Sequence, residues 1–150
     1  MYYKRVIIDE KGKRHIANSA GEFVVMDTLT KCGICFDSEV SFPDLKGDKD
    51  LLRFDFRIHL NNKDILIEVD GRQHKKKTRF TSPNLLKYDK MKDDYCANKA
   101  ITFYRINYSS GNTRFVRQEV KNILIKEGLE WRILNSGLQK VEGDIWKRVS

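Results

Sequence analysis

Two neighbouring segments of alternating apolar and polar residues constrain the fold of this chain most strongly. Residues 52–60 place Leu, Phe, Phe, Ile and Leu at every second position, and the positions between them hold Arg, Asp, Arg and His. Residues 65–70 repeat the alternation after a short polar loop at 61–64. A period of two is typical of a half-buried β-strand. The sequence therefore predicts a β-hairpin with one apolar face and one polar face.

The polar face of this predicted hairpin carries two acids, Asp55 and Glu68. The short loop lets the two carboxylates lie side by side, where like charges destabilise a sheet unless a cation lies between them. Mg²⁺ prefers such oxygen ligands, and on a phosphodiester it can activate water, neutralise charge and assist the leaving oxygen. The alternative is structural: Asp55 pairs with Arg53 or Arg57, and Glu68 is a solvated strand residue.

The remaining segments indicate a single domain with an α/β fold. Residues 1–17 are typical of a basic hairpin, and the capping-box pair Ser19 and Glu22 predicts a helix that runs to about residue 31 and stops at Gly33. The pattern further predicts a strand at 36–42 that Pro43 closes, a helix at about 84–98, a strand at 101–108, and a helix from 112 or 113 to about 126. Residues 129–150 form an extension of ambiguous structure. The order predicts a mixed central sheet flanked by helices, with the core at about 19–127.

Composition bears on partners and compartment. The 150 residues hold 29 Lys and Arg against 21 Asp and Glu, a net charge of +8 that suits a polyanionic partner. No apolar run approaches the roughly 20 residues that span a bilayer, so no membrane partner is expected. Three cysteines are too few for a disulfide framework, which favours the cytoplasm. Cys32 and Cys35 form a C-x-x-C pair, for which a zinc site completed by Cys96 or histidines is the alternative to ordinary small residues between a helix and a strand.

Residues 19–108 resemble the PD-(D/E)XK nuclease superfamily, also called restriction-endonuclease-like. The runs LRFDF, ILIEVDGRQH, YDKMKDDYC and FYRINY carry the resemblance. They are most similar to very-short-patch-repair-like endonucleases and EDxHD homing endonucleases. The resemblance implies an αβββαβ core, a bacterial or phage setting, and catalysis with Mg²⁺ or Mn²⁺. It also implies that Asp55 and Glu68 are acidic metal ligands, that the Val69 carbonyl is a backbone ligand, and that Glu22 completes the catalytic site.

The chain departs from the superfamily pattern at Asp70, where a lysine is expected two residues after the second acid. Three residues could take the role of that lysine. The repair-endonuclease branch has a histidine at the position of His74, and a neutral imidazole is a suitable base near pH 7. Gln73 could position water, and Lys92 lies where some branches place a migrated lysine. Asp89 would close the EDxHD pattern, with Asp93 as the second choice, although Asp89 and Lys92 could simply form a surface ion pair.

A dense run of positive charge follows the acids. Between positions 72 and 92 the sequence has eight Lys or Arg and a single acid. Such a field attracts a phosphate backbone, with binding that weakens as salt rises. The residues predicted to bind nucleic acid are Arg72, Gln73, Lys75, Lys76, Lys77 and Arg79.

These patterns together predict a metal-dependent endodeoxyribonuclease of the homing or repair type. One alternative is a resolvase specific for junctions or branched DNA. Another is a non-catalytic nucleic-acid-binding module derived from the nuclease fold, because the usual lysine is absent. A homodimer could cut both strands at once, whereas a monomer would nick, and both alternatives stay open.

Overall fold

The computed structural model describes residues 5–60, 62–71, 83–109, 111–136, 138–141 and 145–148. The chain forms two compact units. The terminal unit comprises Met1–Cys35 and Tyr108–Ser150, and the sheet unit comprises Phe36–Asn107.

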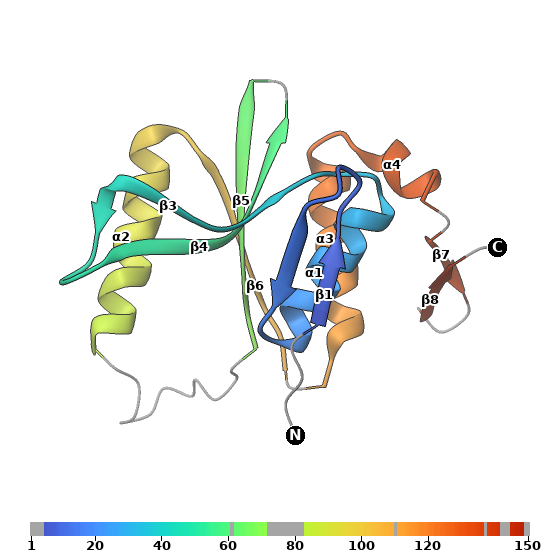
Figure 1. The fold of residues 1–150 in the computed structure, drawn as a ribbon, viewed down its shortest axis with the longest axis horizontal. Coiled ribbons are helices and arrows are strands. Elements are labelled where there is room, and N and C mark those ends of the chain that lie inside the picture. Colours follow the sequence, from blue (N-terminus) through green and yellow to red (C-terminus); the bar gives the residue numbers. More distant parts are fainter. Residues whose placement is uncertain are drawn as a thin grey trace. The chain divides into compact units, whose positions relative to one another are not determined.

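The sheet unit is a four-stranded mixed sheet with one helix (Figure 1). Its elements are β3 (Asp37–Lys46), β4 (Leu51–Leu60), β5 (Lys63–Asp70), α2 (Pro83–Lys99) and β6 (Thr102–Asn107). The strand order is β3-β4-β5-β6; β3, β4 and β5 are antiparallel neighbours, and β6 runs parallel to β5. Helix α2 connects the two parallel strands, as such pairs require. The predicted α/β class with a mixed sheet flanked by helices is confirmed.

Helix α2 covers one face of this sheet through a cluster of apolar side chains. Leu52, Phe54 and Leu66 are buried there, and the Phe54 and Phe103 rings meet edge to face at 5.1 Å. Leu66 lies opposite Arg57 in the β4–β5 ladder, whereas Phe56 lies opposite Ile67. Phe56 therefore faces away from the Leu66 side, although Phe54 packs on it.

The predicted single apolar face of β4 was thus wrong in one respect: the face changes between Phe54 and Phe56, at Asp55. Glu39 lies between the residues that pair with Phe54 and Phe56 and has a φ of 54°. Few non-glycine residues adopt this left-handed conformation, and it marks a local irregularity in the ladder. A two-residue alternation in the sequence cannot reveal such an irregularity.

Strand β3 also differs from its prediction, because it continues through Pro43 to Lys46. Proline has no N–H to donate, so it normally ends a strand unless that strand lies at an edge. Strand β3 is the edge of this sheet, and its pairing with β4 shifts register between Ser41 and Lys46. The irregular edge accommodates the proline.

The terminal unit combines a hairpin with helices. Its elements are β1 (Arg5–Ile8), β2 (Arg14–Ala17), α1 (Ala20–Lys31), α3 (Thr113–Lys126), α4 (Glu130–Leu134), β7 (Leu138–Val141) and β8 (Ile145–Arg148). Strands β1 and β2 form an antiparallel pair, α1 packs against α3, and β7 pairs with β8 (Figure 1). The predicted N-terminal hairpin and both long helices are confirmed, and α4, β7 and β8 lie in the segment left ambiguous. Within the described ranges, no helix is long and apolar enough to cross a membrane.

Local hydrogen bonds fix the start of α1 and the turn before it. The Ser19 hydroxyl accepts the N–H of Glu22 at 3.1 Å, and the Glu22 carboxylate accepts the N–H of Asn18 at 3.0 Å. This is the predicted capping arrangement, except that the Glu22 carboxylate accepts the N–H of the residue before the N-cap and not that of the N-cap itself.

In the β1–β2 turn, the buried Asp9 carboxylate contacts the His15 ring at 2.9 Å and accepts two backbone N–H groups.

Candidate functional site

Two of the predicted metal ligands, the acids Asp55 and Glu68, lie at adjacent positions on neighbouring strands. The β4–β5 ladder ends at the pair Phe56 and Ile67, so Asp55 and Glu68 are the next residues along their strands. The Asp55 Oδ2 atom accepts the N–H of Val69 at 2.9 Å. A side chain on β4 thus replaces the next rung of the ladder and ties Asp55 to the segment that carries Glu68.

Helix α2 brings Lys92 to the same place. The Lys92 ammonium donates to Glu68 Oε2 at 2.5 Å, and the two side chains are only 13% and 16% exposed. The same ammonium lies 5.2 Å from the centre of the Phe54 ring, which forms the apolar floor beside the pair. Of the residues considered for the missing lysine, Lys92 is the one that the described part of the structure places against an acid of the site. The sequence alternative of an Asp89–Lys92 ion pair is not what forms.

Arg105 on β6 is a further charged side chain of this cluster, and sequence reasoning missed it. It lies opposite Glu68 in the parallel β5–β6 register, and its Nε is 3.8 Å from Glu68 Oε1. Its Nη1 is 2.6 Å from Asp93 Oδ1, and its Nη2 donates to the Asp89 carbonyl at 3.1 Å. Only the parallel register between β5 and β6 places Arg105 beside Glu68, and a sequence alone does not supply that register. Both carboxylate oxygens of Glu68 therefore face a cation.

The other predicted site residues are placed as follows. Glu22 caps α1 in the terminal unit, so its role at the metal stays a prediction. Asp70 ends β5 opposite Asn107. The catalytic alternative His74 and the predicted nucleic-acid-binding residues lie outside the described residues; the latter are Arg72, Gln73, Lys75, Lys76, Lys77 and Arg79.

The oxygen atoms beside the paired ends of β4 and β5 are of the chemical type that binds a divalent cation. Asp55 and Glu68 supply carboxylates and Val69 a backbone carbonyl, and Mg²⁺ commonly takes one or two carboxylates with waters and phosphate oxygens. Across the ranges that the structure describes, no group of three His, Cys, Asp or Glu residues is arranged to hold a metal. Metal binding by these residues stays a prediction.

The cysteines contribute thiols to the packed interior. Cys32, Cys35 and Cys96 are free, and Cys32 and Cys96 are buried. Burial, with a smaller effect of the Asp93 charge, raises the pKa of the Cys96 thiol to about 11. Burial also raises the pKa of Cys32. Both thiols stay protonated at neutral pH, a state that disfavours nucleophilic chemistry.

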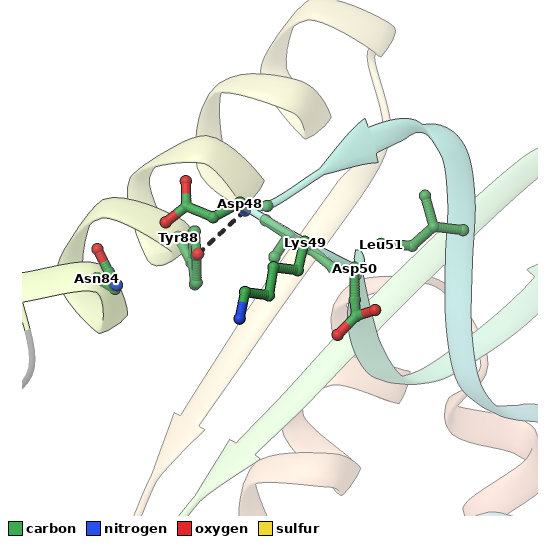
Figure 2. Close-up of a pocket in the computed structure, with 8 residues that line it drawn as sticks. Asp48, Lys49, Asp50, Leu51, Asn84 and Tyr88 are labelled. Atoms are coloured by element: carbon green, nitrogen blue, oxygen red, sulfur yellow. Dashed lines mark hydrogen bonds between the residues drawn. The ribbon is translucent and has the colours of Figure 1, made fainter.

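A surface pocket of about 330 Å³ lies elsewhere in the sheet unit, between the β3–β4 turn and the start of α2 (Figure 2). The N–H of Asp48 donates to the Tyr88 hydroxyl across it at 3.1 Å, as Figure 2 shows. The hydrogen bond from Lys87 lowers the pKa of Asp48. The pocket is lined by Gly47, Asp48, Lys49, Asp50, Leu51, Leu52, Asn84 and Tyr88. No predicted site residue is among them.

Comparison of the sequence with protein-family models found no matching family, and comparison with curated proteins found no match.

Proposed function

We propose that this chain is a metal-dependent endodeoxyribonuclease that hydrolyses phosphodiester bonds in DNA. The observation that supports the proposal is the contact between Lys92 and Glu68, next to Asp55. A nuclease of the resembled superfamily needs two acids and a cation at one place. Asp70 occupies the position where the superfamily has a lysine, and helix α2 brings Lys92 to Glu68 instead.

Each residue has a distinct role in this proposal. Asp55, Glu68 and the Val69 carbonyl would hold Mg²⁺ or Mn²⁺. Such an ion, when bound, polarises the phosphoryl group and lowers the pKa of water. Lys92 orients the attacking water or donates to a phosphate oxygen as negative charge develops there.

A general base is still required, and His74 is the proposed one because a neutral imidazole accepts a proton near pH 7. The basic segment that follows β5 holds the DNA backbone. Its residues position a duplex without reading its sequence, so the proposal covers linear and branched DNA alike.

A second candidate is a non-catalytic nucleic-acid-binding module. The observation that favours it is that the Glu68 carboxylate lies between Lys92 and Arg105. A carboxylate neutralised by two cations has less need of a metal, and its cluster could serve stability alone. The two candidates differ in whether the protein cleaves DNA when Mg²⁺ or Mn²⁺ is present.

The test is cleavage of supercoiled plasmid with Mg²⁺, Mn²⁺ or EDTA by the wild type and three variants: Asp55→Asn, Glu68→Gln and Lys92→Met. Lys99→Met is a matched control, because Lys99 lies on the same helix outside the basic run and pairs with Asp44, where these side chains are 50% and 53% exposed. We expect metal-dependent nicking or linearisation that all three site variants lose and that the control keeps.

The nuclease proposal fails if neither plasmid nor a synthetic four-way junction is cut with either metal. Salt-sensitive DNA binding that the three substitutions leave unchanged would then favour the binding module. Cleavage of the junction alone would instead identify the branched-DNA resolvase.

A further inference from the structure

We propose that Arg105 is a positioning residue for the Lys92–Glu68 pair, holding helix α2 against strand β5 so that the ammonium stays on the carboxylate. The inference rests on the proposed function for its kinetic consequences, and on the structure alone for the positioning itself.

The guanidinium of Arg105 joins three parts of the sheet unit. It projects from β6, it approaches Glu68 on β5 at 3.8 Å, and it contacts two residues of α2. Asp93 is 2.6 Å from Nη1, and the carbonyl of Asp89 accepts from Nη2 at 3.1 Å. Because Asp89 and Asp93 are one helical turn apart, the two contacts fix both the position and the rotation of that turn.

Lys92 lies within this same turn, immediately before Asp93. A lysine side chain has four rotatable bonds and loses much rotamer freedom when it is held in one place. Its ammonium reaches Glu68 only if its backbone position is fixed relative to β5. Arg105 supplies that constraint from the strand beside Glu68, so its effect on the site passes through Lys92.

Arginine suits this task better than lysine. The planar fork of the guanidinium directs separate N–H groups at the Asp93 carboxylate and the Asp89 carbonyl, while its Nε stays 3.8 Å from Glu68. An ammonium, by contrast, is a single point charge. The Phe103 ring lies 4.8 Å from the guanidinium carbon and supports its plane. Arg105→Lys keeps the charge but loses the fork, which makes it the informative conservative variant.

The experiment compares Arg105→Gln and Arg105→Lys with the wild type and with a matched control. Arg53→Gln is that control, because Arg53 lies on the same sheet in an exposed pair with Glu39 at 3.5 Å. The first readout is a lysine-selective ¹⁵Nζ NMR spectrum, in which an ammonium held in a hydrogen bond exchanges slowly with water. Lys92→Met assigns the signal by removing it.

We expect the Lys92 signal in the wild type and in Arg53→Gln, and its loss in both Arg105 variants. The second readout is cleavage kinetics: kcat should fall by about 10- to 100-fold in both Arg105 variants, the range for residues that orient a site's ligands. KM for DNA should stay within about twofold, because an interaction felt only in the transition state leaves binding unchanged.

A Lys92 signal that persists in Arg105→Gln overturns the proposal, and so does full kcat in Arg105→Lys. A raised KM with unchanged kcat also overturns it, because that result assigns Arg105 to the DNA backbone. If Arg105→Gln does not fold, Asp93→Asn carries the test: it leaves Arg105 in place, weakens its contact with α2, and should broaden the Lys92 signal. If the wild type cuts no DNA, the proposed function fails while the NMR spectra still decide the positioning role.

Discussion

Replacing Lys92 with methionine should destabilise the protein in the absence of any metal or DNA. Methionine keeps most of the aliphatic chain but removes the ammonium that donates to Glu68 at 2.5 Å. The carboxylate then loses its nearest cation in a place where it is only 16% exposed, and only Arg105, at 3.8 Å, remains close. Lys90→Met removes a lysine from the same helix without this consequence.

The expected loss follows from burial. Removing one partner of a fully buried ion pair costs about 3–5 kcal/mol, because the other charge is left without a partner. Residual exposure of both side chains and the nearby Arg105 reduce this cost below that range, to about 2 kcal/mol. Exposed i,i+4 pairs contribute about 0.3–0.5 kcal/mol, which sets the expectation for Lys90→Met. At this chain length the Lys92 effect corresponds to a fall in Tm of about 4–8 °C.

Thermal unfolding in EDTA measures the two variants side by side, together with Glu68→Gln and the double variant Lys92→Met/Glu68→Gln. Removing both charges leaves no buried charge behind, so the double variant should be more stable than the sum of the single losses predicts. Equal, small effects of Lys92→Met and Lys90→Met, with additive behaviour in the double variant, would refute the reasoning. The contact that supports the proposed function would then be absent in solution.

Three further outcomes are expected. At pH 8 a thiol reagent should modify Cys35 well before Cys96, because burial and the nearby Asp93 charge raise the pKa of the Cys96 thiol to about 11. Equal labelling rates of the two cysteines, measured by mass spectrometry, would contradict this. The Asp9 carboxyl has a lowered pKa because its hydrogen bonds outweigh its burial, so it stabilises the fold above its unfolded pKa near 3.8 and loses that contribution as pH falls below it; Asp9→Asn should flatten this part of the acid-unfolding curve. Gly21→Ala should cost about 1–3 kcal/mol in urea unfolding, because its methyl group would lie 2.5 Å from the Tyr108 ring; an unchanged midpoint would show that the ring moves aside freely.

Sequence patterns identified the local elements because their causes are local. The alternation at 52–60 and 65–70 predicted β4 and β5, which pair as expected. Ser19 predicted the start of α1 through a side-chain hydrogen bond within one turn, and Gly33 predicted its end, where the structure shows a φ of +70°.

Predictions that depend on pairing were less complete. Strand β3 continues past Pro43 because it lies at an edge of the sheet. Whether a strand lies at an edge depends on which other strands pair with it. The face of β4 changes at Asp55 because the ladder is irregular beside Glu39. The alternation of apolar and polar residues predicts neither the edge position of β3 nor the irregularity beside Glu39.

For the candidate site, the sequence alone determined which chemistry was available: the acids Asp55 and Glu68 on adjoining strands, and Lys92 as one of several replacements for the missing lysine. Only the tertiary structure decided that Lys92 reaches Glu68 and that Arg105 joins them. The reason is physical, because α2 and β6 meet β5 through a parallel crossover whose register depends on how α2 packs on the sheet. That packing is a sum of many side-chain contacts distant in the sequence, and no local pattern contains it.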